Sequence, residues 1–93
     1  MIKSFKDKIT KNIFYSKHIK NVSTHLVKKA KRRMDFLHEA VDLEDMYFPP
    51  SNKFHSLEGF TPTRYAICVD KQWRITFEWQ DGNAYEVVFE DYH

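Results

Sequence analysis

The sequence contains one cysteine and no long apolar run, and each of these scarcities excludes a class of protein. Cys68 has no second thiol to pair with, which excludes a disulfide framework and a thiol cluster for zinc. The first residues, MIKSFKDKITKNIF, interleave lysines with apolar residues, unlike the apolar segment of a signal peptide. Nothing later approaches the roughly 18 apolar residues that span a bilayer. We therefore expect a cytoplasmic protein in which Cys68 is a core thiol.

The chain of 93 residues is large enough for one hydrophobic core, so residues 1–93 are predicted to form one domain. Apolar periodicity predicts a short strand at residues 1–5, a short helix within 6–17 and a longer helix within 21–42. Inward positions of the short helix are expected at Ile9, Ile13 and Phe14. The longer helix is expected to bury a stripe at three- or four-residue spacing: Leu26, Ala30, Met34, Leu37 and Val41.

Three strands are predicted in the C-terminal part, at residues 64–70, 73–80 and 84–93, after a proline-containing loop that encloses a short strand. The middle strand alternates strictly, with Arg74, Thr76 and Glu78 on the face opposite its large apolar residues. Simple alternation in the last strand places Tyr85 on the same face as Val87. The pattern predicts an α+β fold with the helices on one side of an antiparallel sheet, and a C-terminus ordered by strand pairing.

Positive charge is concentrated in the first third of the sequence. Residues 1–33 contain eleven Lys or Arg and one Asp, whereas residues 34–93 contain four basic and twelve acidic residues. Four cations are expected on the exposed side of the longer helix: Lys28, Lys29, Lys31 and Arg32. This asymmetry indicates a surface that faces a polyanion, and the alternative is an ordinary solvated helix face.

Residues in two regions have the chemistry for phosphodiester cleavage without a metal. His55 lies in the loop NKFHSLEG, and the last three residues are Asp91, Tyr92 and His93. A histidine can take the proton of a ribose 2′-hydroxyl or protonate the leaving oxygen, and a tyrosine can stack on a base. Two cations, Arg74 and Lys53, would stabilise negative charge on the phosphate. We expect a cleft between the loop and the last strand to bring these residues together.

Each candidate also has a purely structural interpretation. His55 is then a surface loop residue, the last three residues are a strand end, and Arg74 is a cross-strand partner of Glu86 or Glu90. Metal ligands are not indicated, because the sequence has no HExxH pattern and no close Cys/His pair. No cofactor is expected.

The segments MIKSF, NKFHSLEG, VDKQWRITFEW and EDYH together resemble the HigB toxins of bacterial type II toxin–antitoxin systems, in the RelE/ParE superfamily. The resemblance extends over nearly the whole chain, and its most specific part is W-R-[ILV]-x-F in the penultimate strand followed by a terminal D-Y-H. It implies a RelE/ParE-like α+β fold with an N-terminal strand and two helices packed on an antiparallel sheet. It also implies a toxin that cuts mRNA in the ribosomal A site without a metal. A HigA-like antitoxin would neutralise the toxin, and the complex of the two would bind operator DNA.

Carried over by position, the catalytic residues implied by the resemblance are His55, Asp91, Tyr92 and His93, and the strand arginine is Arg74. The basic helix would lie against ribosomal RNA. The sequence departs from some members at Glu58 and Asp70, where they carry basic residues, which predicts a different rate or substrate preference. Two alternatives are a ParE-like inhibitor of DNA gyrase without nuclease activity and a nucleic-acid-binding module without toxicity.

Overall fold

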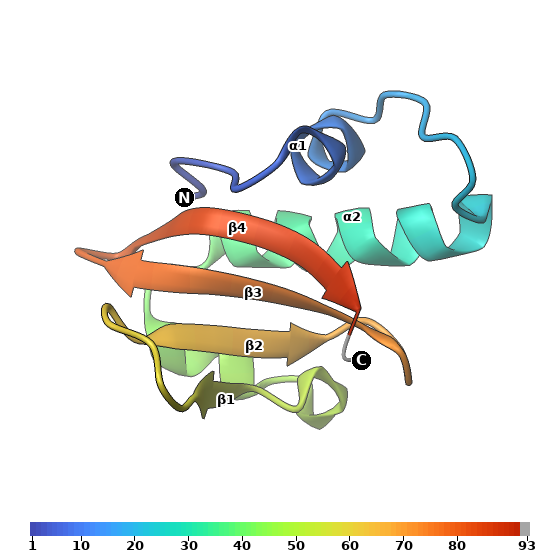
Figure 1. Ribbon diagram of the computed structural model, residues 1–93. Coiled ribbons are helices and arrows are strands. Elements are labelled where there is room, and N and C mark those ends of the chain that lie inside the picture. The colour runs from blue at the N-terminus through green and yellow to red at the C-terminus, as the bar shows by residue number, and fades with distance from the viewer. Residues whose placement is uncertain (92–93) are drawn as a thin grey trace.

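The computed structural model describes residues 1–91, which are built around a four-stranded antiparallel sheet (Figure 1). The strands are β1 (His55–Leu57), β2 (Arg64–Cys68), β3 (Trp73–Gln80) and β4 (Asn83–Asp91). Their order in the sheet follows their order in the chain, with every neighbouring pair antiparallel. This confirms the predicted meander of strands, including a short strand within the loop that precedes Arg64.

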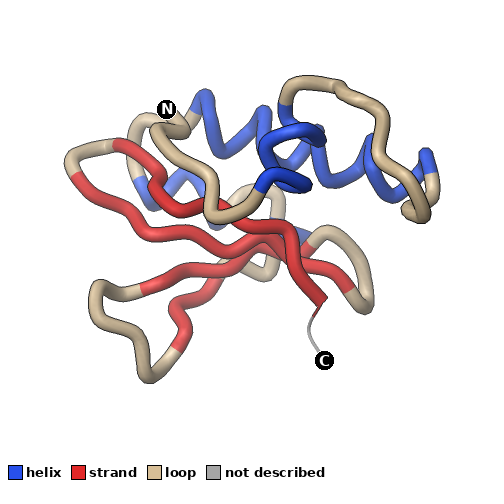
Figure 2. Tube along the Cα trace, turned by 45° about the horizontal axis from the view of Figure 1, so that its top comes forward, coloured by secondary structure: helices blue, strands red, loops and turns tan. Residues whose placement is uncertain are grey.

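Two helices, α1 (Lys8–Phe14) and α2 (Thr24–Glu39), cover one face of the sheet (Figures 1 and 2). Asp7 caps α1 by accepting a hydrogen bond from the backbone N–H of Thr10 at 2.8 Å. Ser23 caps α2 in the same way through the N–H of Leu26, at 3.1 Å. Both side chains satisfy N–H groups that have no partner within the first helical turn. The predicted α+β fold, with two helices packed on an antiparallel sheet, is confirmed.

Two 3₁₀ helices, η1 (Leu43–Tyr47) and η2 (Pro50–Asn52), connect α2 to β1. The first begins with a capping box in which Asp42 and Asp45 participate. The second ends at Asn52 and is followed by its C-cap Lys53, whose φ of 47° places it in the left-handed region. This turn directs the chain from η2 into β1, which begins two residues later.

The N-terminal segment runs parallel to the outer edge of β4. Isolated bridges join Ile2 to Ala84 and Phe5 to Val87. Backbone hydrogen bonds of 2.8 Å from Lys3 N–H to the Ala84 carbonyl and 2.9 Å from Lys6 N–H to the Val87 carbonyl accompany them. The predicted strand at residues 1–5 is thus present as two bridges, and it covers an edge that would otherwise expose unpaired backbone groups.

A β-bulge interrupts the pairing of β3 with β4. Thr76 pairs with Val88 and Glu78 pairs with Tyr85, so β4 contains one residue more than β3 between these pairs. Glu86 adopts a φ of 50° in the bulge, and its N–H donates to the Ser4 hydroxyl at 2.8 Å. Because the extra residue shifts the alternation, the prediction that Tyr85 shares a face with Val87 was wrong.

The core lies between the helices and the sheet. Its fully buried side chains come from both layers: Ile13, Met34, Leu37 and Met46 from the helical layer, and Ile67, Ile75, Phe77 and Val87 from the sheet. At one end of the sheet, Trp73 stacks on Phe89 with ring centroids 4.8 Å apart and an interplanar angle of 12°. The alternating apolar residues of β3 therefore face the helices, as predicted.

Three predictions about inward positions were wrong. Ile9 is 54% exposed, and Thr10 takes the inward position on α1. Val41 is 73% exposed because α2 already ends at Glu39. Cys68 is half-buried on the face away from the helices, since its neighbours Ile67 and Val69 occupy the core-facing positions of an alternating strand.

Thr10 links α1 to β4 through a buried hydrogen bond in which the Phe89 N–H donates to the Thr10 hydroxyl at 2.9 Å. Replacing Thr10 with valine preserves the shape of the side chain but leaves the buried N–H of Phe89 without its hydrogen-bond acceptor. We expect the free energy of unfolding to fall by about 1–3 kcal/mol. Urea denaturation of Thr10→Val measures the loss, and Thr10→Ser is the control because it retains a hydroxyl. Equal stability of Thr10→Val and the wild type would contradict this role.

Candidate active site and RNA-binding surface

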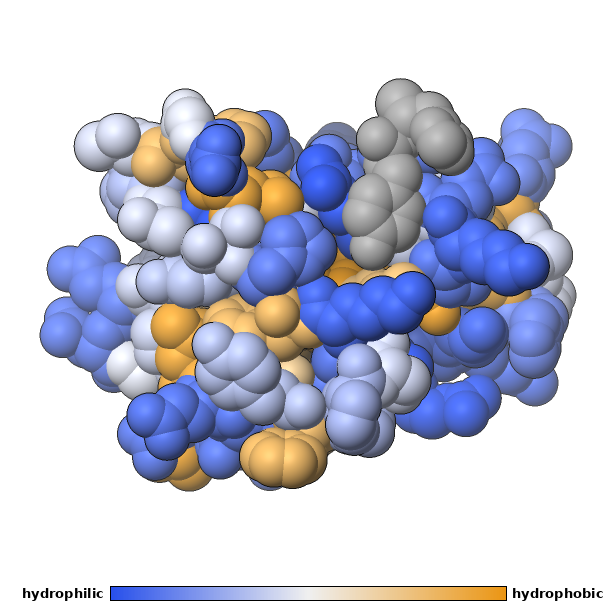
Figure 3. Space-filling model, turned by 90° about the horizontal axis from the view of Figure 1, so that it is seen from below, coloured by the Kyte–Doolittle hydropathy of each residue, from blue (hydrophilic) through white to orange (hydrophobic). Residues whose placement is uncertain are grey.

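The face of the sheet opposite α1 and α2, the open face, carries several of the predicted site residues. Strand register aligns His55 with Ala66 on β2, Ala66 with Thr76 on β3, and Thr76 with Val88 on β4. Paired residues in neighbouring strands share a face, so this row crosses the open face. Figure 3 shows the molecule from the side of the β1 edge of the sheet, where hydrophilic residues surround smaller hydrophobic areas.

His55 begins β1 and is exposed. Its Nδ1 lies 2.7 Å from the backbone carbonyl oxygen of Lys53. A carbonyl oxygen can only accept a hydrogen bond, so Nδ1 must carry a proton in this contact. In the neutral ring the other nitrogen, Nε2, is then the proton acceptor, which is the state that a general base requires.

Arg74 lies on the open face within a chain of polar contacts. Its Nη2 is 3.6 Å from the Glu90 Oε2. The other carboxylate oxygen of Glu90 accepts a hydrogen bond from the Thr76 hydroxyl at 2.6 Å. The cross-strand interpretation of Arg74 was therefore right for Glu90 and wrong for Glu86, because Glu86 lies in the bulge. The ion pair holds the guanidinium in place and is compatible with a role in binding phosphate.

Arg64, which the sequence analysis missed as a site residue, continues this chain from β2. It is only 6% exposed. Its Nη2 donates to the Thr76 hydroxyl at 3.1 Å and to the Glu86 carbonyl at 2.7 Å, and its Nη1 is 3.2 Å from Glu78. Arg64 thus links the bulge to Thr76, whose hydroxyl donates a hydrogen bond to Glu90. An arginine within the otherwise apolar RYAIC, opposite the acidic positions of the next strand, was the available signal.

Asp91 ends β4, where it pairs with Trp73 and accepts a hydrogen bond from Gln72 Nε2 at 2.9 Å. It directly follows Glu90, the partner of Arg74, so Asp91 and Arg74 belong to the same end of the sheet. His55 lies on the other edge strand, and β2 and β3 separate β1 from β4. The sheet therefore does not pair His55 with Asp91. Their joint action stays a prediction, and Tyr92 and His93 lie outside the described residues.

The four cations predicted on α2 lie on two sides of the helix. Lys28 and Lys31 line a cavity next to α1, and Lys29 and Arg32 line a different one beside Pro49. This separation follows from the helical rotation of about 100° per residue, which groups positions three or four apart. Lys31 also forms an ion pair of 2.9 Å with Asp35. The four cations, expected together on the exposed side of the helix, thus belong to two separate basic surfaces.

A third basic hollow connects α2 with the end of the open face. It has a volume of about 570 Å³, and its cationic lining consists of Lys29, Arg33, Lys53 and Lys71. Arg33 Nη1 donates to the Asn52 Oδ1 at 2.9 Å, and the fully buried Asn52 donates to the Met46 and Phe48 carbonyls at 3.2 Å each. The guanidinium of Arg33 is therefore oriented by a fixed side chain. Asp70, one of the acidic departures noted above, also lines this hollow.

Two further features are absent from residues 1–91. No group of three or more His, Cys, Asp or Glu side chains in this range is arranged to hold a metal ion. No helix in the same range has the length and apolar character to cross a membrane.

Comparison with known proteins relates the whole chain to one family. Residues 3–93 match the model of the HigB-like toxins, described as the RelE-like toxin of the type II toxin–antitoxin system HigB. The chain is 33% identical to Endoribonuclease HigB of Proteus vulgaris over 93 residues, which cover 100% of both chains. It is 32% identical to Toxin HigB-1 of Vibrio cholerae serotype O1 over 85 residues, or 90% of each chain. With this match over nearly its full length, and with the fold that the resemblance implied, the chain belongs to the HigB-like family of RelE-like toxins of type II toxin–antitoxin systems.

Proposed function

We propose that this toxin is an endoribonuclease that cleaves mRNA in the A site of the ribosome and thereby inhibits translation. The observation that carries the proposal is the full-length similarity to a protein named Endoribonuclease HigB. The open face supports it, because an exposed histidine and a fixed arginine lie there on a rigid sheet. Both side-chain types suit acid–base cleavage of a phosphodiester.

The chemistry we propose uses the ribose 2′-hydroxyl as the nucleophile. A general base removes the 2′-hydroxyl proton, and the oxygen attacks the adjacent phosphorus. The bond from phosphorus to the 5′-oxygen of the next nucleotide breaks, and a general acid protonates that oxygen. His55 and His93 are the candidates for base and acid in either order. Asp91 would orient a catalytic group, and Tyr92 would stack on a base.

Two cations would stabilise the negative charge that develops on the phosphate during this attack. Arg74 provides a planar guanidinium at the end of the sheet nearest Asp91, and Lys53 adjoins His55 through its own carbonyl. Guanidinium groups bind phosphate oxygens in a forked geometry, and fixed donors aimed at developing charge are among the largest contributors to catalysis. No metal is required in this mechanism.

The basic surfaces of α2 would hold the toxin on the ribosome. We propose that Lys28, Lys29, Lys31 and Arg32 contact ribosomal RNA, with an affinity that falls as salt rises. Action on translating ribosomes would take place in the cytoplasm. As a member of a toxin–antitoxin system, the protein has an antitoxin partner, which we propose is HigA-like. We propose that the complex of the two binds operator DNA.

The proposal is tested by incubating purified toxin with an mRNA on ribosomes that present a defined A-site codon, and with the same mRNA free in solution. We expect cleavage of the ribosome-bound message only, and loss of this cleavage in His93→Ala. A folding control, such as the melting temperature of the variant, separates catalysis from stability. Absence of cleavage at every codon, combined with inhibition of gyrase-dependent supercoiling, would instead establish the ParE-like activity.

A further inference from the structure

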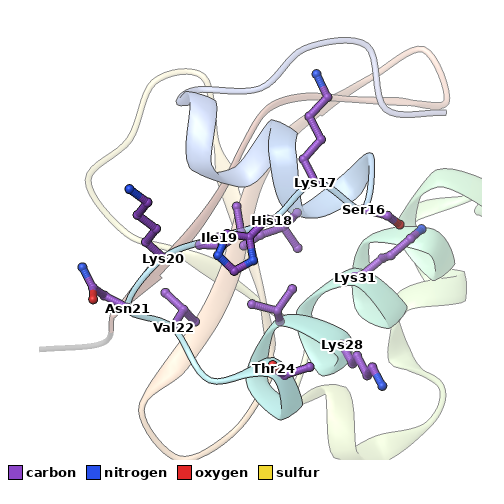
Figure 4. A pocket seen from close by; sticks show the side chains of 12 residues that line it. Ser16, Lys17, His18, Ile19, Lys20, Asn21, Val22, Thr24, Lys28 and Lys31 are labelled. Atoms are coloured by element: carbon purple, nitrogen blue, oxygen red, sulfur yellow. The ribbon is translucent and has the colours of Figure 1, made fainter.

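A cavity of about 730 Å³ lies between α1, the connecting segment 15–23 and the first half of α2 (Figure 4). Its apolar lining consists of Ile13, Ile19, Val22 and Val27. Ile13 is fully buried and the other three are half-buried, and both Ile19 and Val27 pack against the core. The cavity therefore has a fixed apolar floor that is continuous with the interior of the protein.

The rim of this cavity is uniformly basic. Its charged lining residues are Lys17, Lys20, Lys28 and Lys31, and among residues 1–91 no Asp or Glu lines it. Figure 4 shows these lysines around the cavity, with two carried by the connecting segment and two by α2. Lys31 is engaged by Asp35 at 2.9 Å, whereas Lys17 and Lys20 are exposed. We call this feature the lysine-rimmed groove.

The lysine-rimmed groove lies in the helical layer, whereas the open face lies on the opposite side of the sheet (Figures 1 and 4). Its lining residues come from Ile13 to Lys31, and they include neither His55 nor Asp91, the candidate catalytic residues that the structure describes. An occupant of the groove therefore contacts the protein through residues that the proposed cleavage chemistry does not use.

We propose that the lysine-rimmed groove binds an acidic segment of the antitoxin, with aliphatic or aromatic side chains placed on the apolar floor. The rim is complementary to carboxylates, which would set the orientation and raise the association rate. The floor favours a protein over a nucleic acid, because a phosphate backbone can use the rim but gains nothing from Val22 and Val27. Amphipathic protein segments that lay an apolar face into such a groove are a common mode of recognition.

Binding of the purified cognate antitoxin to toxin variants, measured by calorimetry, tests this assignment. Lys17→Glu/Lys20→Glu reverses the charge of the rim at exposed positions, and Val22→Asp places a carboxylate on the half-buried floor. We expect each variant to raise the Kd at least about 10-fold. The matched control is Lys3→Glu/Lys8→Glu, which makes the same charge change at exposed lysines outside the groove and should leave the Kd within about 2-fold of the wild type.

Cleavage of ribosome-bound mRNA is measured in parallel. Both groove variants keep Lys28 and Lys31, the two rim lysines that we propose contact ribosomal RNA, so they are expected to cleave like the wild type. The inference rests on family membership and not on the cleavage mechanism, so a toxin without nuclease activity would leave the binding test valid. Unchanged antitoxin affinity in both groove variants would overturn the assignment. Loss of ribosomal activity with antitoxin affinity retained would also overturn it, because the groove would then bind RNA. Unchanged melting temperatures ensure that these outcomes report on binding.

Discussion

Replacing Arg74 with alanine is expected to slow cleavage of ribosome-bound mRNA by about 100- to 1000-fold, as removal of one fixed charge-stabilising donor does in other enzymes. The guanidinium is 3.6 Å from Glu90, which is in turn held at 2.6 Å by the Thr76 hydroxyl. These contacts fix a cation at the end of the sheet that also contains Asp91. Because the Arg74 side chain is still 20% exposed, a phosphate can reach part of it.

Arg74→Lys is the informative companion variant, since it keeps the charge and loses the planar fork. We expect it to be slower than the wild type and faster than Arg74→Ala. Single-turnover rates at saturating ribosome concentration separate the chemical step from binding to the ribosome. If Arg74→Ala cleaves at the wild-type rate under these conditions, the guanidinium does not stabilise charge on the phosphate.

Replacing Arg64 with alanine is expected to lower the free energy of unfolding by about 3 kcal/mol. The substitution removes donors from the Thr76 hydroxyl and the Glu86 carbonyl, and it leaves Glu78 without its 3.2 Å partner. Arg64 is almost fully buried, so water cannot easily replace it. Glu78 is partly exposed, with 28% of its side chain accessible, which keeps the expected loss at the low end for a broken buried ion pair.

Urea denaturation measures this loss, and Glu78→Gln provides a control that removes the charge while keeping Arg64 and the bulge contact. Glu78→Gln should lower the free energy of unfolding by less than Arg64→Ala does, because the hydrogen bonds from Arg64 to Thr76 and Glu86 remain. A loss below about 1 kcal/mol for Arg64→Ala would be the value of an exposed ion pair, and it would contradict the role of Arg64 as the buried link between β2, β3 and the bulge.

Local patterns in the sequence predict most of the architecture. The alternation of Trp73, Ile75, Phe77 and Trp79 identifies the face of β3 that packs on the helices, and Asp81-Gly82 marks the turn into β4. The spacing of Ala30, Met34 and Leu37 identifies the buried side of α2. These signals are local because helical and strand periodicities arise within one element. They are sufficient to predict two helices on an antiparallel meander.

Long-range pairing determines what the patterns do not predict. The bulge at Glu86 depends on contacts with Ser4 and Arg64, which are distant in the sequence. The register of four strands places His55 and Asp91 on opposite edge strands, although a cleft between them was predicted. The order of strands across a sheet is not visible in any single strand.

The basic helix illustrates the same limit in the candidate site. Composition identifies Lys28, Lys29, Lys31 and Arg32 as one group, whereas packing of α2 against α1 and the connection to β1 divides them between separate hollows. One of these hollows has the apolar floor that we assign to the antitoxin. The other adjoins Arg33, which is fixed by Asn52. Residues from other segments of the chain complete each of these surfaces, so the sequence of α2 alone does not predict what each surface binds.

We propose that this toxin cleaves RNA through attack by the ribose 2′-hydroxyl. The most direct measurement compares two ribosome-bound mRNAs that differ only by a 2′-deoxy substitution at the nucleotide whose 3′-phosphate is cut. We expect the unmodified message to be cut, leaving a 2′,3′-cyclic phosphate, and the deoxy message to remain intact. Equal cleavage of both messages, or a 5′-phosphate on the downstream fragment, would contradict it.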